Sequence, residues 1–358
     1  MKNLAPAKLI AYYLPQFHPI PENDEWWGRG FTEWTNTAKA KPMFRGHYQP
    51  HVPADLGFYD LRVPETRAAQ AEMAREYGIT GFCYYHYWFA GKRLLEKPFE
   101  AVLQSKEPDF PFCLCWANQT WTGIWHGAPN RILIEQTYPG LSDHQRHFET
   151  LFPAFTDKRY IKVDNKPIFF IFKADELPES AKTIDVWQNM AVKSGLDGLH
   201  FVAVSGVGRW NPLENGFDAI SPPPNWNLRP WVSRRNPIKY LKNKFDIYRG
   251  LPTIYSYEKW LHTQDKYEYL SPKYYPCVTH AWDNTPRSGK NGLILKNSSP
   301  ELFGNVLDEA IRSVKNNPDD KKIVTLKSWN EWAEGNHLEP DLKFDRSYLE
   351  AIRNLVKK

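Results

Sequence analysis

The sequence of 358 residues lacks the features that would place it among membrane-spanning, secreted or disulfide-rich proteins. No apolar run reaches the roughly 18 residues that a membrane-spanning helix needs. The opening residues, MKNLAP, have neither the apolar stretch nor the cleavage site of a secretory signal, so we expect a cytoplasmic protein. Only 4 cysteines occur. They are too dispersed for a zinc site, and we expect reduced cysteines in the core.

Nucleotide-binding and metal-binding motifs are missing as well. No GxGxxG follows a predicted strand and no DxD occurs; the nearest acidic pair is Asp319-Asp320 in a polar segment. Neither HxH nor HExxH is present, so we expect histidine rings to bond sugar or backbone rather than metal. This expectation covers His18, His51, His86, His280 and His337. The sequence therefore predicts no metal and no cofactor.

Net positive charge is confined largely to one segment. The formal net charge is +5, from 46 basic and 41 acidic residues. Residues 221–249 contain seven basic residues and one acidic residue, so the rest of the chain is near neutral. We expect no nucleic-acid partner, because such proteins present a broad basic footprint. Lysines alternate with apolar residues in this segment, which could form an amphipathic lid, contact an anionic glycan or lipid diphosphate, lie near a membrane, or simply be a solvated loop.

Aromatic residues, in contrast, are abundant at 15% of the chain, which excludes disorder. Short apolar runs alternate with amphipathic ones, as in βα units. Strands are predicted at residues 9–14, 81–88, 112–116, 167–172, 199–204, 217–221, 275–280 and 322–327. Helices are predicted at 63–77, 92–105, 143–155, 180–194, 300–314 and 347–357. Eight strands predict an α/β protein, a (β/α)8 TIM barrel forming one catalytic domain over residues 1–358, with long loops after strands 1 and 6.

Polar and aromatic residues recur where the predicted strands end. Barrel enzymes gather their functional groups at that edge. Aromatic faces together with amides and carboxylates suit a sugar, which offers C–H patches and hydroxyls. The alternative is structural, because indoles also fill cores and asparagines cap helices. The candidate substrate-binding residues are Tyr13, Gln16, His18, His86, Trp88, Trp116, Asn118, Trp282, Asp283, Asn284, Asn330 and Trp332.

Two glutamates in the segment SWNEWAEGNHLEP are the candidate catalytic residues. Glu331 and Glu334 are three positions apart and would share one face of a helical turn. Glycoside chemistry needs two carboxyl groups of different pKa, and repulsion between like charges raises the pKa of one of them. Alternatively, both glutamates could cap the N-terminus of a helix, where their negative charges would interact favourably with the helix dipole. Glu33 is a further candidate carboxylate, with helix capping or a salt bridge as its alternative role.

Five segments resemble the glycoside hydrolase family 99-like proteins called WbsX, which are often labelled glycosyltransferases because they occur among O-antigen and capsule biosynthesis functions. They are residues 11–36, 46–62, 81–98, 112–122 and 328–340. The segments are more distantly similar to the endo-α-mannosidases and endo-mannanases of family 99 itself. Those enzymes are retaining (β/α)8 barrels.

The resemblance implies that Glu331 is the base and Glu334 the general acid/base. The sugar 2-OH would attack the anomeric carbon to form a 1,2-anhydro sugar, while Asn330 positions a carboxylate or sugar hydroxyl and Trp332 walls the site. We therefore expect a retaining, endo-acting glycoside hydrolase of a bacterial surface polysaccharide, O-antigen or capsule. The expected partner is an oligo- or polysaccharide substrate, either neutral or anionic. The alternatives are a glycosyltransferase or transglycosidase of O-antigen or capsule biosynthesis, and a non-catalytic glycan-binding barrel.

Overall fold

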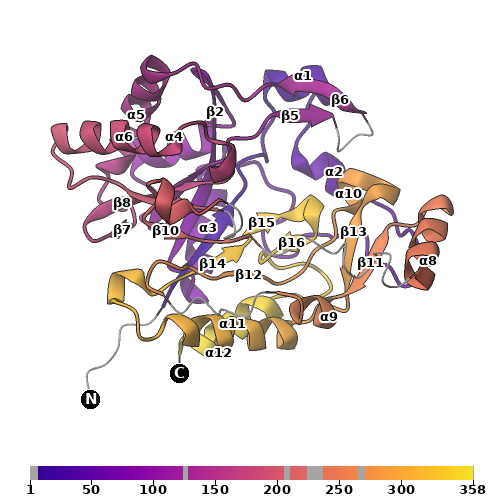
Figure 1. Ribbon diagram of the computed structural model, residues 1–358. Coiled ribbons are helices and arrows are strands. Elements are labelled where there is room, and N and C mark those ends of the chain that lie inside the picture. The colour runs from indigo at the N-terminus through magenta and orange to yellow at the C-terminus, as the bar shows by residue number, and fades with distance from the viewer. Residues whose placement is uncertain (1–6, 124–127, 205–209, 224–236, 265–270, 358) are drawn as a thin grey trace.

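The computed structural model describes residues 7–123, 128–204, 210–223, 237–264 and 271–357 (Figure 1). Eight strands build its main sheet: β1 (Lys8–Tyr13), β2 (Gly81–Phe89), β4 (Phe112–Trp116), β8 (Lys166–Ile171), β9 (His200–Ala203), β10 (Ala219–Ile220), β12 (Cys277–Thr279) and β14 (Ile323–Lys327). They run parallel in the order β10-β9-β8-β4-β2-β1-β14-β12. Each predicted strand is confirmed to within two residues at either end.

The sheet is curled, and its two outer strands meet at a single point. Ile220 in β10 forms an isolated parallel bridge with Tyr274, just before β12. The Ile220 N–H donates to the Lys273 carbonyl at 2.8 Å, and the Tyr275 N–H donates to the Ile220 carbonyl at 2.8 Å. Between β9 and β10, the described part of the chain forms only the 3-10 turn η3 (Pro212–Asn215). The structure thus shows an α/β fold with a curled parallel sheet, which is less regular than the barrel predicted from the sequence.

Helices cover the outside of this sheet. They are α3 (Pro64–Glu76), α4 (Lys97–Ser105), α5 (Leu141–Phe155), α6 (Ser180–Lys193), α11 (Pro300–Val314) and α12 (Ser347–Val356). Figure 1 shows α4, α5 and α6 on one side and α11 with α12 along the bottom. Helix α11 begins as expected of its sequence, because Ser299 caps the Leu302 N–H and Pro300 occupies the first turn.

The prediction of a helix from residue 92 is wrong in its first turn. Residues Lys92–Leu94 form strand β3, which pairs antiparallel with the end of β2. Ala90 and Gly91 both have positive φ, at 48° and 94°, and turn the chain back on itself. A second short strand, β7 (Lys162–Val163), pairs with β8 in the same antiparallel manner.

Two long insertions, residues 15–61 after β1 and 222–273 after β10, carry further elements. The first holds α1 (Pro21–Trp27) and α2 (Glu33–Lys39), which lie beside the hairpin of β5 (Trp121–Gly123) and β6 (Ala128–Ile134) in Figure 1. The second holds α8 (Pro237–Tyr248), β11 (Thr253–Ser256) and α9 (Tyr257–Leu261). Helix α10 (Thr285–Ser288) and β13 (Leu293–Lys296), the partner of β11, follow β12. The hairpin β15 (Asn330–Glu331) and β16 (Asn336–His337) follows β14.

Burial explains the apolar character of the strands. The central strands β1, β2, β4 and β8 are covered on both faces, so their side chains are buried almost without interruption. All four cysteines are unpaired, and three of them are fully buried in β2 and β4, in agreement with the expected core role.

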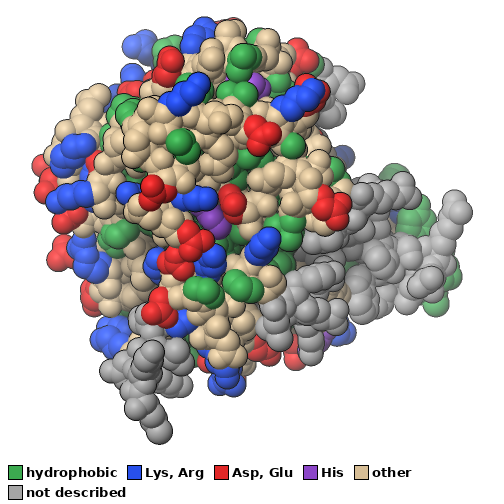
Figure 2. All heavy atoms as spheres, turned by 60° about the vertical axis from the view of Figure 1, so that its left-hand side comes forward, with side chains coloured by type: hydrophobic (Ala, Val, Ile, Leu, Met, Phe, Trp, Pro, Cys, Tyr) green, Lys and Arg blue, Asp and Glu red, His purple; other side chains and the backbone are tan. Residues whose placement is uncertain are grey.

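The surface was expected to lack a broad basic field, and the face shown in Figure 2 intersperses lysines and arginines with acidic side chains. Within the described residues, no helix is both long and apolar enough to cross a membrane. Helix α8 exposes Ile238, Leu241, Phe245 and Tyr248. Residues 224–236 of the basic segment lie outside the described residues, and membrane contact through 221–249 stays a prediction.

Candidate active site

A cavity of about 480 Å³ opens beside the ends of the parallel strands, beneath the first insertion and the β5–β6 hairpin. We call it the carboxylate cavity, because Glu33, Glu331 and Glu334 face it. Its size suits a small ligand or a few sugar rings. The other lining residues are Leu14, Gln16, Asn23, Trp27, Phe31, Asn36, Tyr85, Tyr87, Ala117, Gln119, Thr120, Trp121, Thr122, Leu133, Phe172, Lys173, Glu176, Arg287 and Lys327.

Arg287, at the end of α10, holds the three carboxylates together. Its Nε lies 2.7 Å from Glu33 Oε1, its Nη2 lies 2.9 Å from Glu331 Oε2, and its Nη1 lies 2.6 Å from Glu334 Oε1. The three glutamates come from α2, β15 and the 3-10 turn η6 (Trp332–Glu334). One rigid guanidinium fork therefore ties three separate elements to one centre.

A second cation, Lys327 at the end of β14, lies beside the same centre. Its ammonium is 3.6 Å from Glu334 Oε2 and 5.3 Å from the ring centroid of Trp282. Glu334 Oε2 is buried and accepts no hydrogen bond from the described residues. Three carboxyl groups thus face two cations, which leaves one negative charge in excess. That excess favours protonation of one carboxyl group.

Glu331 is the carboxyl group whose protonation this excess charge favours. Burial raises the pKa of the Glu331 carboxyl to about 7, and the like charge of Glu334 adds to this effect while Arg287 and Lys327 oppose it. A carboxyl with a pKa near neutrality can exchange protons at physiological pH, as general acid–base catalysis requires. The sequence predicts that repulsion between like charges raises the pKa of one glutamate; for Glu331, burial is the larger cause and the repulsion adds to it.

The hairpin that carries the glutamates is fixed by local hydrogen bonds. Ser328 Oγ donates to the Asn336 carbonyl at 2.6 Å and accepts from the Glu331 N–H at 3.1 Å. Gly335 turns the chain with a φ of +56°, and a Cβ there would lie 2.9 Å from the Cβ of Asp283. The Asp283 N–H donates to the Glu334 carbonyl at 2.6 Å. Only glycine fits this close approach and this backbone conformation.

Aromatic side chains and amides form the walls of the carboxylate cavity. Trp121 lies edge-on to Tyr87, with ring centroids 5.0 Å apart. Asn23 in α1 and Asn36 in α2 are buried, yet neither the Asn23 amide nor Asn36 Oδ1 has a hydrogen-bond partner among the described residues. Buried amides normally find partners. Because both residues line the cavity, we expect a polar ligand or water in it to form the missing hydrogen bonds.

Four predicted residues line the carboxylate cavity, namely Gln16, Glu33, Glu331 and Glu334, and Glu33 also forms the salt bridge that was its alternative role. Two others support it from below. Asn330 is fully buried and holds Leu14, accepting from its N–H at 2.7 Å and donating to its carbonyl at 3.0 Å. The Trp332 indole N–H donates to Glu339 at 2.6 Å, and its ring stacks on His337 with centroids 3.6 Å apart. Both residues therefore position the hairpin.

Four predicted residues pack on the outer side of the sheet against α5 and its surroundings. His86 Nε2 lies 2.8 Å from His147 Nε2, and Trp88 stacks on His147 while donating to Asp143. Trp116 lies edge-on to the same His147 ring, with centroids 4.7 Å apart. Asn118, just after β4, bonds the backbone of Lys173. Its Nδ2 donates to the Lys173 carbonyl, and its Oδ1 accepts from the Lys173 N–H. None of the four lines the carboxylate cavity.

The remaining predicted residues also lie away from that cavity. The Tyr13 hydroxyl donates to Gln70 in α3 at 2.7 Å, and His18 Nδ1 lies 3.0 Å from the Pro15 carbonyl. Asn284 accepts from the N–H of Leu293 in β13 at 2.7 Å. Trp282 and Asp283 face a second cavity of about 140 Å³ on the other side of the hairpin.

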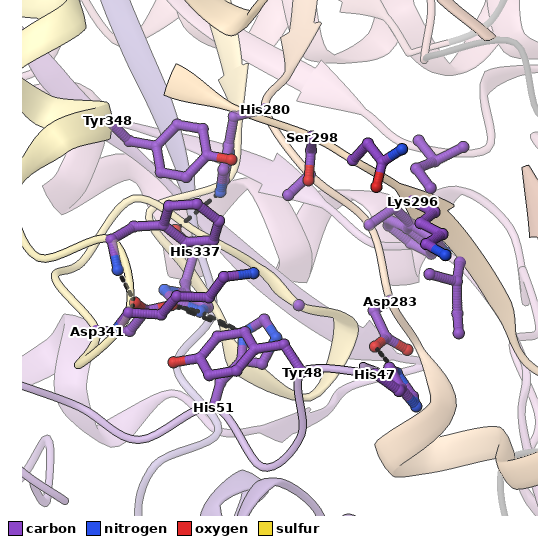
Figure 3. A pocket seen from close by; sticks show the side chains of 18 of the residues that line it. His47, Tyr48, His51, His280, Asp283, Lys296, Ser298, His337, Asp341 and Tyr348 are labelled. Atoms are coloured by element: carbon purple, nitrogen blue, oxygen red, sulfur yellow. Dashed lines mark hydrogen bonds and ion pairs between the residues drawn. The ribbon is translucent and has the colours of Figure 1, made fainter. Parts of the chain in front are cut away.

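We call this second space the histidine cavity, because His47, His51, His280 and His337 line it (Figure 3). Asp283 Oδ2 lies 2.7 Å from His47 Nε2 and accepts from the Gln49 amide at 2.8 Å. Burial would raise the pKa of Asp283, but the hydrogen bonds from His47, Thr285 and Gln49 outweigh it and lower that pKa. The cavity thus holds its own polar network, separate from the glutamates.

Sequence reasoning missed Arg287 and Lys327, which organise the glutamates, and Tyr85, Tyr87 and Trp121, which form the walls. No motif marks Arg287, which occurs in the segment DNTPRSGKN. A signal did exist for the tyrosines, because side chains alternate along a strand and Tyr85 and Tyr87 share one face of β2. The prediction chose the opposite face, with His86 and Trp88.

Comparison with solved structures shows which fold this is. A glycoside hydrolase-like protein matches 99% of this chain and 95% of its own, at a TM-score of 0.59 and 13% identity. The GH99 endo-alpha-mannosidase from Bacteroides thetaiotaomicron matches 98% of this chain and 96% of its own, at a TM-score of 0.59 and 13% identity. At these identities the likeness concerns the fold alone, and the chain shares the fold of those proteins.

Sequence comparison places the chain in a family. Residues 9–352 match the family described as Glycosyltransferase WbsX, and the chain belongs to that family. Two relatives from strains of Xanthomonas campestris pv. campestris, both named Uncharacterized protein WxcX, are 37% identical over 353 residues. This alignment covers 98% of the chain and 50% of each relative, so the chain spans about half the length of the curated relatives it matches. The WbsX-type, family 99-like resemblance stated from the sequence is confirmed.

Proposed function

We propose that the chain is a carbohydrate-active enzyme, a retaining glycoside hydrolase that acts within a bacterial surface polysaccharide. The observation that carries the proposal is the pair of buried glutamates on one turn, held by one guanidinium, with the pKa of Glu331 raised to about 7. The aromatic and amide walls of the cavity add the surfaces that sugars need. The fold shared with an endo-alpha-mannosidase and the WbsX family also support this function.

In the proposed mechanism, the Glu331 carboxylate removes the proton of the sugar 2-OH. The freed oxygen attacks the anomeric carbon, the glycosidic bond breaks, and Glu334 donates a proton to the leaving oxygen. Glu334 then takes a proton from water, the resulting hydroxide opens the 1,2-anhydro ring, and Glu331 returns its proton to the 2-oxygen. Two displacements give retention of configuration. No carboxylate on the far side of the ring is needed, which suits two glutamates on a single turn.

Geometry supports these roles. Arg287 donates to Oε1 of Glu334 and to Oε2 of Glu331. The other oxygen of Glu334, Oε2, accepts no hydrogen bond from the described residues. The parallel bridge between Ile220 and Tyr274 supports a closed (β/α)8 barrel as the single catalytic domain that presents them.

The test compares two variants on two kinds of substrate. Surface polysaccharides of the encoding bacterium are screened for release of reducing ends, and an oligosaccharyl fluoride is prepared from the one that is cleaved. We expect Glu334→Gln to lose about 10²- to 10⁴-fold on the polysaccharide but to keep far more of the rate of fluoride release in a single turnover, because fluoride leaves without a proton and water enters only in the second step. Glu331→Gln should lose activity on both substrates.

The control is Glu149→Gln, an exposed residue on α5 whose change should leave both rates unaltered. Full activity of Glu334→Gln on the polysaccharide would contradict the assignment. A substrate lacking the 2-OH tests the anhydro step separately, since its turnover would require another nucleophile.

Other products would point to the alternative functions. Consumption of a labelled sugar nucleotide would favour a glycosyltransferase, as the family's description suggests. Products larger than the substrate would favour a transglycosidase, in which a sugar hydroxyl opens the anhydro ring. Tight glycan binding without any product would favour a non-catalytic glycan-binding protein.

A further inference from the structure

Three buried side chains in the histidine cavity converge on one point. His51 comes from the first insertion, His337 from β16, and Asp341 from the segment that follows it, and each is at most 8% exposed. Their ligand-type atoms lie within 4.8 Å of one another. Figure 3 shows the two imidazoles and the carboxylate turned toward each other at one end of this cavity.

The distances between these atoms match a metal site. His51 Nδ1 lies 2.9 Å from His337 Nε2 and 4.0 Å from Asp341 Oδ2, and His337 Nε2 lies 3.7 Å from Asp341 Oδ2. A triangle with these sides has a circumradius of about 2.1 Å, which is the length of Zn–N and Zn–O bonds. One ion at its centre would therefore reach all three atoms with little movement.

Hydrogen bonds outside the triangle set the correct ligand atoms. His337 Nδ1 lies 2.9 Å from the Glu339 carbonyl, so this nitrogen carries the ring proton and Nε2 presents its lone pair to the triangle. Asp341 Oδ1 accepts from the N–H groups of Lys343 and Phe344 at 2.8 and 2.7 Å, which turns Oδ2 toward the imidazoles. Such outer contacts are the usual way in which proteins orient metal ligands.

We propose that His51, His337 and Asp341 bind one divalent transition-metal ion, with Zn²⁺ the ion that two imidazoles and a carboxylate favour. The ion would be structural. His337 pairs with Asn330 in the hairpin and stacks on Trp332, so a metal bond to His337 would fasten the glutamate-bearing hairpin to the first insertion. The small cavity beside the triangle leaves room for a water molecule as a fourth ligand.

The experiment uses the full chain without an affinity tag, stripped with a chelator and then titrated with Zn²⁺ or Co²⁺. We expect one equivalent of Zn²⁺ to bind, Co²⁺ to give visible absorption bands of a low-coordinate site, and Mg²⁺ not to compete. His51→Ala should weaken Zn²⁺ binding at least about tenfold. His47→Ala, which changes the neighbouring histidine that bonds Asp283, should bind Zn²⁺ as the parent chain does.

Two results would overturn the proposal. The first is Zn²⁺ affinity that is equal in the parent chain and in His51→Ala, with circular dichroism showing that both are folded. The second needs no variant: crystals soaked in Zn²⁺ would show an anomalous peak away from the triangle, or none. Because every readout is metal binding, the outcome of this test does not depend on whether the chain has the proposed glycosidase activity.

Discussion

The hairpin from Asn330 to His337 separates two cavities that keep their buried polar groups in opposite ways. On one side, the carboxylates of Glu331 and Glu334 are paired with Arg287 and Lys327. On the other side, imidazoles face each other, and burial lowers the pKa of His280 to about 3, with repulsion by His337 adding to it. One side therefore neutralises buried carboxylates with cations, whereas on the other side burial keeps the His280 imidazole uncharged. Buried charge persists only where an opposite charge has been built beside it.

The largest expected effect comes from removing Arg287, the cation that the three carboxylates share. Arg287→Met leaves three buried carboxyl groups without their shared cation, so the free energy of unfolding at pH 7 should fall by about 3–5 kcal/mol. Arg287 opposes the rise in the pKa of Glu331, so its removal should raise that pKa further above the value in the unfolded chain. The loss should therefore grow as the pH rises toward this raised pKa and shrink at lower pH, where the Glu331 carboxyl is neutral.

Urea unfolding at several pH values measures this effect. Arg62→Met is the matched control, because Arg62 is half exposed beside Asp60 and its loss should cost less than about 1 kcal/mol. Equal stability of Arg287→Met and the parent chain would show that the carboxylates are not held by Arg287.

A second prediction compares two buried amides near the carboxylates. Asn330 bonds both polar groups of the Leu14 backbone, so Asn330→Ala should cost about 2 kcal/mol by leaving them unpaired. Asn23 has no partner among the described residues, so Asn23→Ala should cost less than about 1 kcal/mol while weakening glycan binding. Unfolding measurements and glycan titrations separate the two roles. A large loss of stability in Asn23→Ala would show that its amide belongs to the fold.

The smallest effect is a shift in pH dependence. As a base, Glu331 must be deprotonated, so kcat/KM should fall as the pH drops below about 7, where this carboxyl takes up its proton. The charge of Glu33 helps to raise the pKa of Glu331. Glu33→Gln should therefore shift this fall in kcat/KM, the acidic limb of the profile, to lower pH. His47→Gln, on the opposite side of the hairpin, should leave it in place. Movement with His47→Gln would show that the two cavities are coupled.

The sequence reasoning worked best where the signal was local. Glu331, at the end of β15, and Glu334, in the 3-10 turn η6 that follows it, face one cavity together, as their spacing predicted, while their catalytic role stays a prediction. The prediction failed on strand β2, where His86 and Trp88 were chosen and Tyr85 and Tyr87 line the cavity. All nine residues of β2 are buried. The alternation of side chains indicated that Tyr85 and Tyr87 share one face, but burial on both faces left open which face meets the cavity.

The sequence by itself determined the strands, most of the helices and the paired glutamates, because hydrophobic periodicity and short spacings are properties of neighbouring residues. Tertiary structure decided which side of each strand meets the cavity, and it brought Arg287 within hydrogen-bond distance of Glu33, 254 positions away. It also brought His51 to His337, across 286 positions. Charge balance and ligand geometry are set by such distant contacts, which only the folded chain creates.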